Sequence, residues 1–179
     1  MNLNEPLAYR VRPKTLEEYV GQEHVIGEGK ILYRTIKADR LSSIILFGPP
    51  GCGKTSLARV ISETTKYKFY KINAVTAGVS DIKKVIEETK NFMLNPTGKS
   101  ILFIDEIHRF NKLQQDALLP YVENGTIILI GATTENPYFE VNKALISRSM
   151  VVKLEPLTTE NIYTVLKNAL KNKEGLRRI

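Results

Sequence analysis

The segment that most constrains the fold is GPPGCGKT, residues 48–55, which stands between an apolar run and a helical pattern. The run before it, SSIILFG at 42–48, is rich in β-branched residues and predicts a buried strand. The segment at about 54–65 has the apolar spacing of a helix. A strand, this glycine turn and a helix together satisfy the phosphate-loop motif G-x-x-x-x-G-K-[ST].

The chemistry of this loop explains its residue types. Its glycines let successive backbone N–H groups point at phosphate oxygens, and the helix N-terminus adds the positive end of its dipole. Lys54 is predicted to reach the β- and γ-phosphates, and the Thr55 hydroxyl to bind Mg²⁺. An ordinary Gly/Pro turn does not require Lys-Thr at this offset. The predicted nucleotide-binding residues of the loop are Gly48, Pro49, Pro50, Gly51, Cys52, Gly53, Lys54, Thr55 and Ser56.

A second apolar run, SILFID at 100–105, ends in two adjacent acids. We expect this third strand to lie beside the first, which would place its carboxyl end next to the bound phosphates. Asp105 is then predicted to hold Mg²⁺, directly or through water. Glu106 is predicted to activate the attacking water. Two acids that simply begin a helix are the alternative, but they would not explain the phosphate loop upstream.

Strand and helix patterns alternate along the chain, which predicts the α/β class with a five-stranded parallel sheet and helices on both faces. The N-terminal residues are polar and broken by prolines, so we expect a loop that wraps the sheet. Residues 1–156 are predicted to form the nucleotide-binding core, and 157–179 to begin a second, helical unit. The expected strands are 42–48, 68–73, 100–105, 126–132 and 150–156, and the expected helices lie at about 54–65, 80–94, 112–123 and 142–147, with one more inside 29–41 and one after Pro156.

Composition narrows the class further. The chain of 179 residues is 42% hydrophobic and 25% charged, as expected of one ordinary globular domain. No apolar run approaches the ~18 residues that span a bilayer, and the first residues, MNLNEPLAYRVRP, lack a secretory signal. We therefore expect a cytoplasmic protein without membrane contact. The net charge of +7 is compatible with a nucleic-acid partner and equally with a generally basic proteome.

Two other nucleotide-dependent classes fit less well. The string Asp-Glu-Ile-His resembles the D-E-x-H box of helicases, but those enzymes need a second nucleotide-clamping domain that 179 residues do not hold. His108 is therefore expected to be a structural or coupling residue rather than a base. A GTPase usually selects guanine with Asn-Lys-x-Asp, and NKLQ at 111–114 and NKAL at 142–145 lack that Asp. Adenine is the expected base.

Together these motifs resemble the AAA+ ATPases, in the branch of the clamp loaders and the Holliday-junction motor RuvB. The chain is most similar to the RarA/MgsA family of replication-associated recombination proteins, which includes the eukaryotic Werner-helicase-interacting ATPase. The resemblance covers residues 6–158. It is carried by PLAYRVRPKTLEEYVGQEHVIGEGK, GPPGCGKTSLAR, FIDEIHRFNKLQQDALLPYVENGTIILIGATTENPYFEVNKALISRS and VVKLEPLT.

The resemblance implies roles for further residues. Thr133, with Thr134 as the alternative, matches the sensor-1 position and would hold the attacking water or γ-phosphate from the side opposite Glu106. Arg148 in ISRS matches the arginine finger that reaches the ATP of a neighbouring subunit in trans. Asn73 matches the polar residue that restrains the catalytic glutamate until DNA binds. Tyr19, Val20 and Gly21 match the segment that packs on adenine and ribose.

The resemblance also implies the activity and its partners. We expect ATP and Mg²⁺ as cofactors, DNA (forked, single-stranded or a junction) as a partner, and contacts with replication or repair proteins such as single-strand-binding protein or a helicase. A nucleoid-associated homo-oligomer that remodels DNA or DNA-bound proteins at stalled forks is the first hypothesis. A clamp-loader subunit or RuvB-like branch-migration motor is the second.

One departure bears on activity. Members of the family continue through a complete helical lid, which carries a sensor-2 arginine, into a helical oligomerisation domain. The present sequence ends after about one lid helix within 157–179. We therefore expect slow ATP turnover by this chain and no reliable partner for Arg148. A nucleotide-gated module that binds DNA or protein with little hydrolysis is the third hypothesis.

Overall fold

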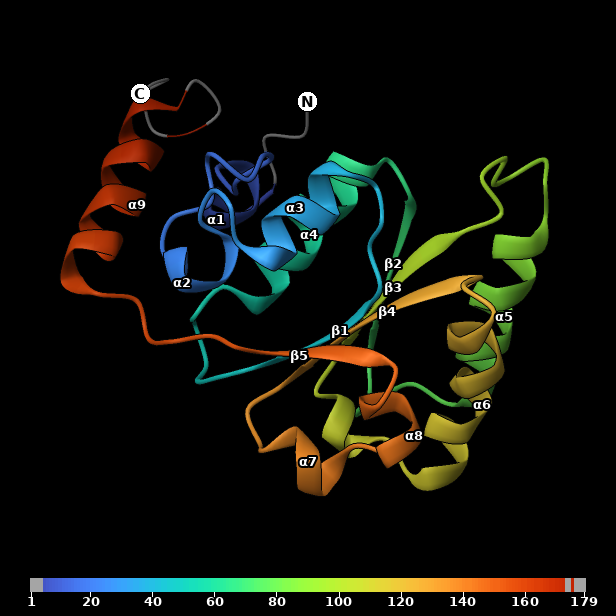
Figure 1. The fold of residues 1–179 in the computed structure, drawn as a ribbon. Helices are drawn as coiled ribbons and strands as arrows, with labels where there is room; N and C mark the ends of the chain where they lie inside the picture. Colours follow the sequence, from blue (N-terminus) through green and yellow to red (C-terminus); the bar gives the residue numbers. More distant parts are fainter. Residues whose placement is uncertain (1–4, 173–174, 176–179) are drawn as a thin grey trace.

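The computed structural model describes residues 5–172 and residue 175. Its centre is one sheet of five parallel strands in the order β2-β3-β4-β1-β5 (Figure 1). The predicted α/β class and five-stranded parallel sheet are therefore confirmed. The strands are β1 (Ser43–Phe47), β2 (Lys68–Asn73), β3 (Ser100–Asp105), β4 (Ile127–Thr133) and β5 (Ser149–Lys153).

Helices cover both faces of this sheet, as predicted. Figure 1 shows α3 and α4 on one face and α5 and α6 on the other, with α7 and α8 beyond one edge of the strands. The helices of the described residues are α1 (Leu7–Arg10), α2 (Glu23–Ile26), α3 (Ile31–Lys37), α4 (Lys54–Thr65), α5 (Val79–Lys90), the 3₁₀ turn η1 (Ile107–Arg109), α6 (Lys112–Glu123), α7 (Pro137–Glu140), α8 (Lys143–Ile146) and α9 (Thr159–Lys171).

The apolar core is split by the sheet into two clusters. Alternate residues of a strand point to opposite faces, so Ile44 and Leu46 of β1 pack under α4 while Ile45 packs toward α5 and α6. β3 and β4 divide their side chains between the two clusters in the same way. All seven residues of β4 are buried. This double burial explains why the central strands read as unbroken apolar runs.

The strand order corrects one prediction. β3 does not lie beside β1, because β4 is inserted between them and pairs with both. The sequence gives no warning of this, since β1, β3 and β4 are equally apolar. With neighbouring strands about 4.8 Å apart, the end of β3 lies roughly 10 Å from the end of β1 across the sheet. The carboxyl end of β4 fills the space between them.

The N-terminal segment differs from the predicted loop. It contains two single-turn helices, α1 and α2, and α3 follows them inside the expected 29–41. Helices of four residues are too short for apolar periodicity to reveal them. Elsewhere the strand and helix limits agree with the predictions to within a few residues.

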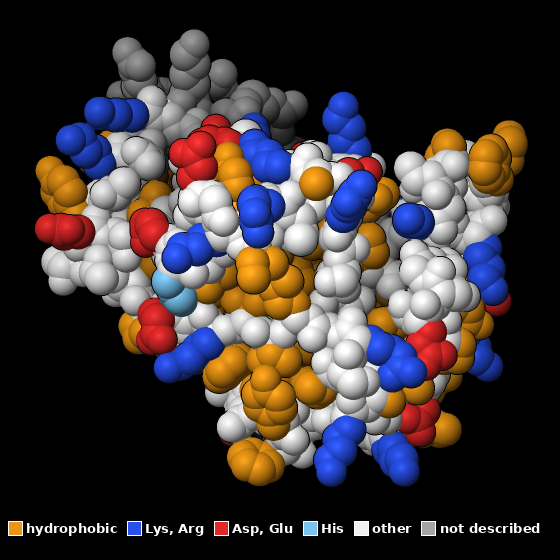
Figure 2. All heavy atoms as spheres, in the orientation of Figure 1, with side chains coloured by type: hydrophobic (Ala, Val, Ile, Leu, Met, Phe, Trp, Pro, Cys, Tyr) orange, Lys and Arg blue, Asp and Glu red, His pale blue; other side chains and the backbone are white. Residues whose placement is uncertain are grey.

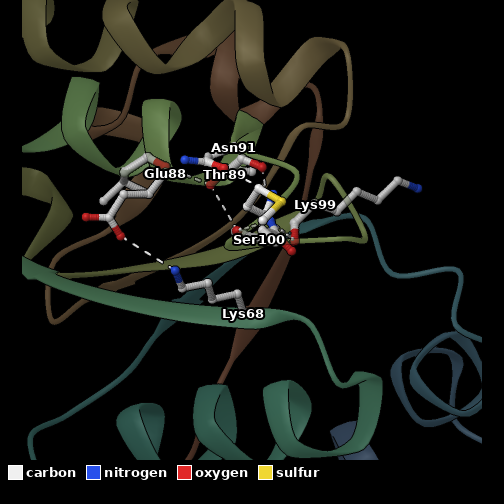
Figure 3. A network of polar contacts seen from close by, with 9 residues as sticks. Lys68, Glu88, Thr89, Asn91, Lys99 and Ser100 are labelled. Carbon is white, nitrogen blue, oxygen red and sulfur yellow. Dashed lines mark hydrogen bonds and ion pairs between the residues drawn. The ribbon is translucent and has the colours of Figure 1, made fainter.

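The predicted helix 80–94 ends early, at Lys90. The Asn91 Oδ1 accepts the Met93 N–H at 3.0 Å, a local turn that competes with the helix. Figure 3 shows the contacts behind this end: the Thr89 hydroxyl donates to Ser100 Oγ at 2.9 Å and joins α5 to β3. The same view shows the ion pair between Lys68 of β2 and Glu88 of α5, whose Nζ and Oε2 atoms lie 3.6 Å apart.

The predicted strand 150–156 also ends early, at Lys153. The backbone N–H of Glu155 donates to Gln22 Oε1 at 2.9 Å, so that a side chain replaces the neighbouring strand as its partner. The chain then leaves the sheet and enters α9.

The last helix, α9, is built differently from the others. Thr158 caps its N-terminus by accepting the Asn161 N–H at 3.1 Å. The helix has no buried residue along its length, and Figure 1 shows it beside α1 and α2, at the far left of the molecule. Its apolar residues Ile162, Val165 and Leu166 are all exposed. Within the described part of the chain, no helix has the length and hydropathy needed to cross a membrane.

Candidate nucleotide-binding site

The phosphate loop leaves β1 at its carboxyl end and enters α4. The Gly48 N–H donates to the Thr133 carbonyl at 3.2 Å, so the first residue of the loop lies against the end of β4. Gly51 and Gly53 have φ of +78° and +100°, which glycine adopts without strain. A Cβ at Gly53 would also clash with the Tyr19 hydroxyl. The predicted glycine turn before a helix is therefore present, with Gly53 as the N-cap of α4.

Lys54 is folded into the loop that it is predicted to serve. Its Nζ donates to the carbonyl oxygens of Gly48 at 2.7 Å and Pro49 at 2.9 Å. It lies 3.8 Å from the sulfur of Cys52, a buried residue. The curl of the loop therefore encloses a positive charge, beside the N-terminus of a 12-residue helix. Both features attract phosphate.

Tyr19 and Gly21 connect the N-terminal segment to this loop. The buried Tyr19 hydroxyl donates to the Gly53 carbonyl at 3.2 Å, and burial raises the pKa of this phenol. Both residues line a pocket of about 230 Å³ on the N-terminal segment, whereas Val20 is half-buried and does not line it. Gly21 has a φ of +85°, and a Cβ there would lie 2.9 Å from Leu157 Cδ2. The start of the α9 region is thus packed against the same segment.

Gln22 is a structural residue of the site that the sequence analysis missed. Its Nε2 donates to the Cys52 carbonyl at 3.2 Å and to the Glu155 carbonyl at 2.7 Å. The side chain is buried and its own φ is +63°. It therefore ties the phosphate loop to the segment after β5. A long polar side chain next to Tyr-Val-Gly is the one sequence signal that was available.

The acidic pair stands at the carboxyl end of β3. The Asp105 Oδ2 lies 3.8 Å from Lys71 Nζ, on the neighbouring strand β2. Glu106 is the N-cap of η1 and has a φ of +57°, which is unusual for a residue other than glycine. The register pairs Ile104 with Gly131, so that these acids stand beside the last residues of β4.

Thr133 and Glu106 converge on the imidazole of His108. The Thr133 Oγ1 lies 2.8 Å from His108 Nδ1, and His108 Nε2 lies 3.3 Å from Glu106 Oε2. We expected Thr133 to act from the side opposite Glu106; here one ring joins the two side chains. Thr133 is buried and Thr134 is exposed, which places Thr133 rather than Thr134 in the interior.

Two predicted site residues have other contacts. The Asn73 Oδ1 accepts the Val75 N–H at 2.8 Å, and the described contacts of Glu106 are with His108 instead. Arg148 Nη2 lies 2.7 Å from Glu123 Oε1, and its Nη1 donates to the Ala144 carbonyl at 2.9 Å. Its predicted contact with a neighbouring subunit stays a prediction.

The oxygen-bearing side chains Thr55 and Asp105 suit Mg²⁺ better than they suit a metal ion whose ligands all come from the protein. Among residues 5–172 and 175, no three or more His, Cys, Asp and Glu side chains are grouped as a metal site. Thr55 lies in the first turn of α4 and Asp105 is the last residue of β3, so each places an oxygen-bearing side chain at the carboxyl edge of the sheet. Mg²⁺ usually binds one or two protein oxygens and completes its shell with phosphate and water. The residues present fit that ion.

Comparison with known proteins agrees with this geometry. The ATPase family associated with various cellular activities (AAA) matches residues 44–156. The "Replication-associated recombination protein A" of Haemophilus influenzae is 51% identical over 172 residues, which cover 96% of this chain and 38% of that protein. The "ATPase WRNIP1" of Dictyostelium discoideum is 51% identical over 166 residues, which cover 93% of this chain and 19% of that protein.

A solved structure is also similar. The Thermotoga maritima RuvB Holliday junction branch migration motor has a TM-score of 0.73 and 28% identity over 90% of this chain and 54% of that chain. The chain thus spans 38% of the length of its bacterial relative from Haemophilus influenzae. The predicted resemblance to the RarA family is confirmed. Because the family profile covers well over half of the residues, 44–156 of 179, the chain belongs to the AAA family of ATPases.

Proposed function

We propose that this chain is the ATP-hydrolysing core of a protein that acts in DNA replication and recombination. One observation carries the proposal. Three neighbouring strands of the sheet, β1, β4 and β3, end at the same edge. Their carboxyl ends carry, in that order, the loop with Lys54, the buried Thr133, and the acids Asp105 and Glu106. In open parallel sheets, ligands bind at this edge.

The proposed roles follow from the positions of the side chains. Lys54 exchanges its two carbonyl contacts for the β- and γ-phosphates, since a charged oxygen is the stronger acceptor. Thr55 and Asp105 hold Mg²⁺, which neutralises phosphate charge when bound. Glu106 orients and deprotonates the attacking water, and Thr133 binds the γ-phosphate or that water. Asn73 acts on Glu106 only after a rearrangement of the β2–α5 turn.

The pocket beside Tyr19 and Gly21 is the proposed site for adenine and ribose, with Val20 contributing backbone. Three of its lining residues, Glu17, Glu23 and Glu28, are acidic, which suits an uncharged base and disfavours phosphate. The Tyr19 hydroxyl donates to the Gly53 carbonyl, so one residue that lines this pocket also contacts the phosphate loop. We propose residues 157–179 as the start of a lid over the nucleotide; residues 173–174 and 176–179 of it lie outside the described residues, as do residues 1–4 of the core.

DNA is the proposed partner, at stalled forks, single strands or junctions. Lys and Arg are scattered among acidic and apolar side chains on the face shown in Figure 2, so a DNA contact would draw on dispersed charges there. Identity of 51% to the recombination protein, against 28% to the RuvB branch migration motor, favours this role over branch migration. A homo-oligomer with Arg148 reaching the next subunit, replication or repair partners, and a cytoplasmic, nucleoid-associated location complete the proposal.

The experiment that tests hydrolysis replaces Glu106 with Gln. The Glu106→Gln variant should bind ATP as the wild type does, while DNA-stimulated phosphate release falls by at least ~10²-fold, because the amide cannot accept the proton. Glu160→Gln, at the exposed start of α9, is the matched control and should keep the wild-type rate. Equal phosphate release by Glu106→Gln and the wild type would refute the base assignment.

Rates should be measured against protein concentration, with and without forked DNA, on this chain and on a longer one. A rate per subunit that rises with concentration supports an intersubunit site. A rate that forked DNA leaves unchanged in the longer chain would reject the DNA-dependent activity.

A further inference from the structure

His108 occupies a place that the proposed catalytic roles do not explain. It lies on η1, directly after the acidic pair, and its ring contacts Thr133 of β4 through Nδ1 and Glu106 through Nε2, at 2.8 and 3.3 Å. The side chain is about 10% exposed, against 36% for Glu106. The side chain of Thr133 on β4 and that of Glu106, the residue after β3, therefore meet on one ring that is largely removed from water.

The fold around η1 holds the ring in this place. Ile107 is fully buried against β4, and a Cβ at Gly131 would lie only 2.8 Å from Ile107 Cδ1. The Arg109 N–H donates to the Glu106 carbonyl at 2.8 Å and closes the turn. These surroundings hold Glu106 in the left-handed backbone region, a strained conformation for a residue other than glycine that occurs often at functional positions.

The hydrogen-bond partners select one tautomer of His108. Thr133 Oγ1 accepts the Glu135 N–H at 3.0 Å, which leaves its own single hydrogen to donate. His108 Nδ1 at 2.8 Å is a nearer acceptor than the Glu135 carbonyl at 3.5 Å. A neutral imidazole that accepts at Nδ1 carries its hydrogen on Nε2, which faces the Glu106 carboxylate. The opposite tautomer would turn a lone pair toward that carboxylate, so it is disfavoured.

We propose that His108 is a positioning residue that couples the Thr133 hydroxyl to the Glu106 carboxylate. The coupling rests on the proposed function, in which Thr133 meets the γ-phosphate. The hydroxyl has one hydrogen, so it cannot donate to Nδ1 and to a phosphate oxygen at once. When that hydrogen turns toward phosphate, the ring loses the partner that fixes its orientation. The Nε2–H hydrogen bond to the Glu106 carboxylate changes with the orientation of the ring. Phosphate binding at Thr133 is thereby transmitted to Glu106, the proposed base.

Imidazole NMR tests this link directly, because the chain has only two histidines. His24 is the internal control, since its ring lies 3.1 Å from the Lys153 carbonyl, away from the acidic pair. In the nucleotide-free chain, Thr133→Val should move the Nδ1 resonance of His108 toward that of a free neutral imidazole and leave His24 unchanged. Adding a non-hydrolysable ATP analogue with Mg²⁺ to the wild type should move the His108 resonances in the same direction.

The kcat values of two His108 variants distinguish the role of Nε2 from that of Nδ1. His108→Gln places an amide N–H near the position of Nε2, whereas His108→Asn places its polar group near Nδ1 and cannot reach Glu106. Both variants should bind a fluorescent ATP analogue as the wild type does. His108→Asn should lower kcat by about 10- to 100-fold, the range expected for one hydrogen bond to a charged group. His108→Gln should retain more activity than His108→Asn.

Three results would overturn the coupling: a His108 resonance unmoved by Thr133→Val, equal kcat for the Asn and Gln variants, or a parallel loss of nucleotide affinity in both. A wild type that hydrolyses ATP no faster than Glu106→Gln would instead reject the proposed function. The nucleotide-free NMR comparison still decides the link in that case, so the two failures are distinguishable.

Discussion

Helices α4 and α9 have almost the same length, 12 and 13 residues, and both carry an apolar stripe, yet their surroundings are opposite. Leu57, Val60 and Ile61 of α4 are fully buried against the sheet. The corresponding stripe of α9 has no buried residue. Apolar periodicity therefore predicts a helix but not its partner. The phosphate loop leads directly into the buried helix α4. The site therefore depends more on the packing of α4 against the sheet than on α9.

The largest expected effect is on ATP binding, when a lysine of α4 and a lysine of α9 are each replaced with Ala. Lys54→Ala should weaken ATP binding by about 100-fold or more, because the variant loses the one charge inside the loop. Lys167→Ala, on α9, is the matched control and should bind as the wild type does. Fluorescence titration with an ATP analogue measures both. Unchanged binding by Lys54→Ala, in a variant that keeps the wild-type unfolding midpoint, contradicts the role of the loop.

Replacing a leucine in each of the two helices should change the free energy of unfolding by very different amounts. Leu57→Ala removes a fully buried side chain and should lower the free energy of unfolding by about 2–5 kcal/mol. Leu166→Ala, 60% exposed on α9, should change it by less than ~0.5 kcal/mol. Urea unfolding gives both values. A large loss at Leu166 would mean that α9 is packed in solution, and the contrast between the helices would fail.

A smaller effect is expected at Gln22, which joins the two regions. Gln22→Ala leaves the Glu155 N–H and the Cys52 carbonyl without their side-chain partner and should cost about 1–3 kcal/mol of stability. It should also weaken nucleotide binding, because the Cys52 carbonyl belongs to the phosphate loop. Gln114→Ala on α6 is the control, since it removes the side-chain oxygen that accepts the Asn111 N–H at the start of that helix and should keep nucleotide affinity. Equal nucleotide affinity in the wild type and Gln22→Ala would show that the loop holds its shape alone.

The sequence predicted those parts of the fold that depend on local patterns. The strand at 68–73 and the helix at 112–123 agree with β2 and α6. The prediction that β3 lies beside β1 was wrong, because β4 lies between them. Pairing order depends on the tertiary packing of strands that look alike in sequence. The first prediction for the acids therefore placed Asp105 one strand too close to Lys54.

The site followed the same division. Lys54 and Asp105 could be proposed from the sequence because each belongs to a short local pattern, a glycine turn before a helix and an acidic pair after an apolar strand, and both stand at the carboxyl edge of the sheet. The contacts of Gln22 and His108 were not found, because their partners lie far away in sequence, 133 residues for Gln22 with Glu155 and 25 for His108 with Thr133. A polar side chain reveals its partner only when the strands are assembled.

The most direct measurement is a crystal structure of the chain with Mg²⁺ and a non-hydrolysable ATP analogue at saturating concentration. The account predicts phosphates against the backbone of residues 48–55, Lys54 Nζ moved from the Gly48 carbonyl onto a phosphate oxygen, and the metal between Thr55 and Asp105. An analogue bound elsewhere, with Lys54 still on the Gly48 carbonyl, would contradict it.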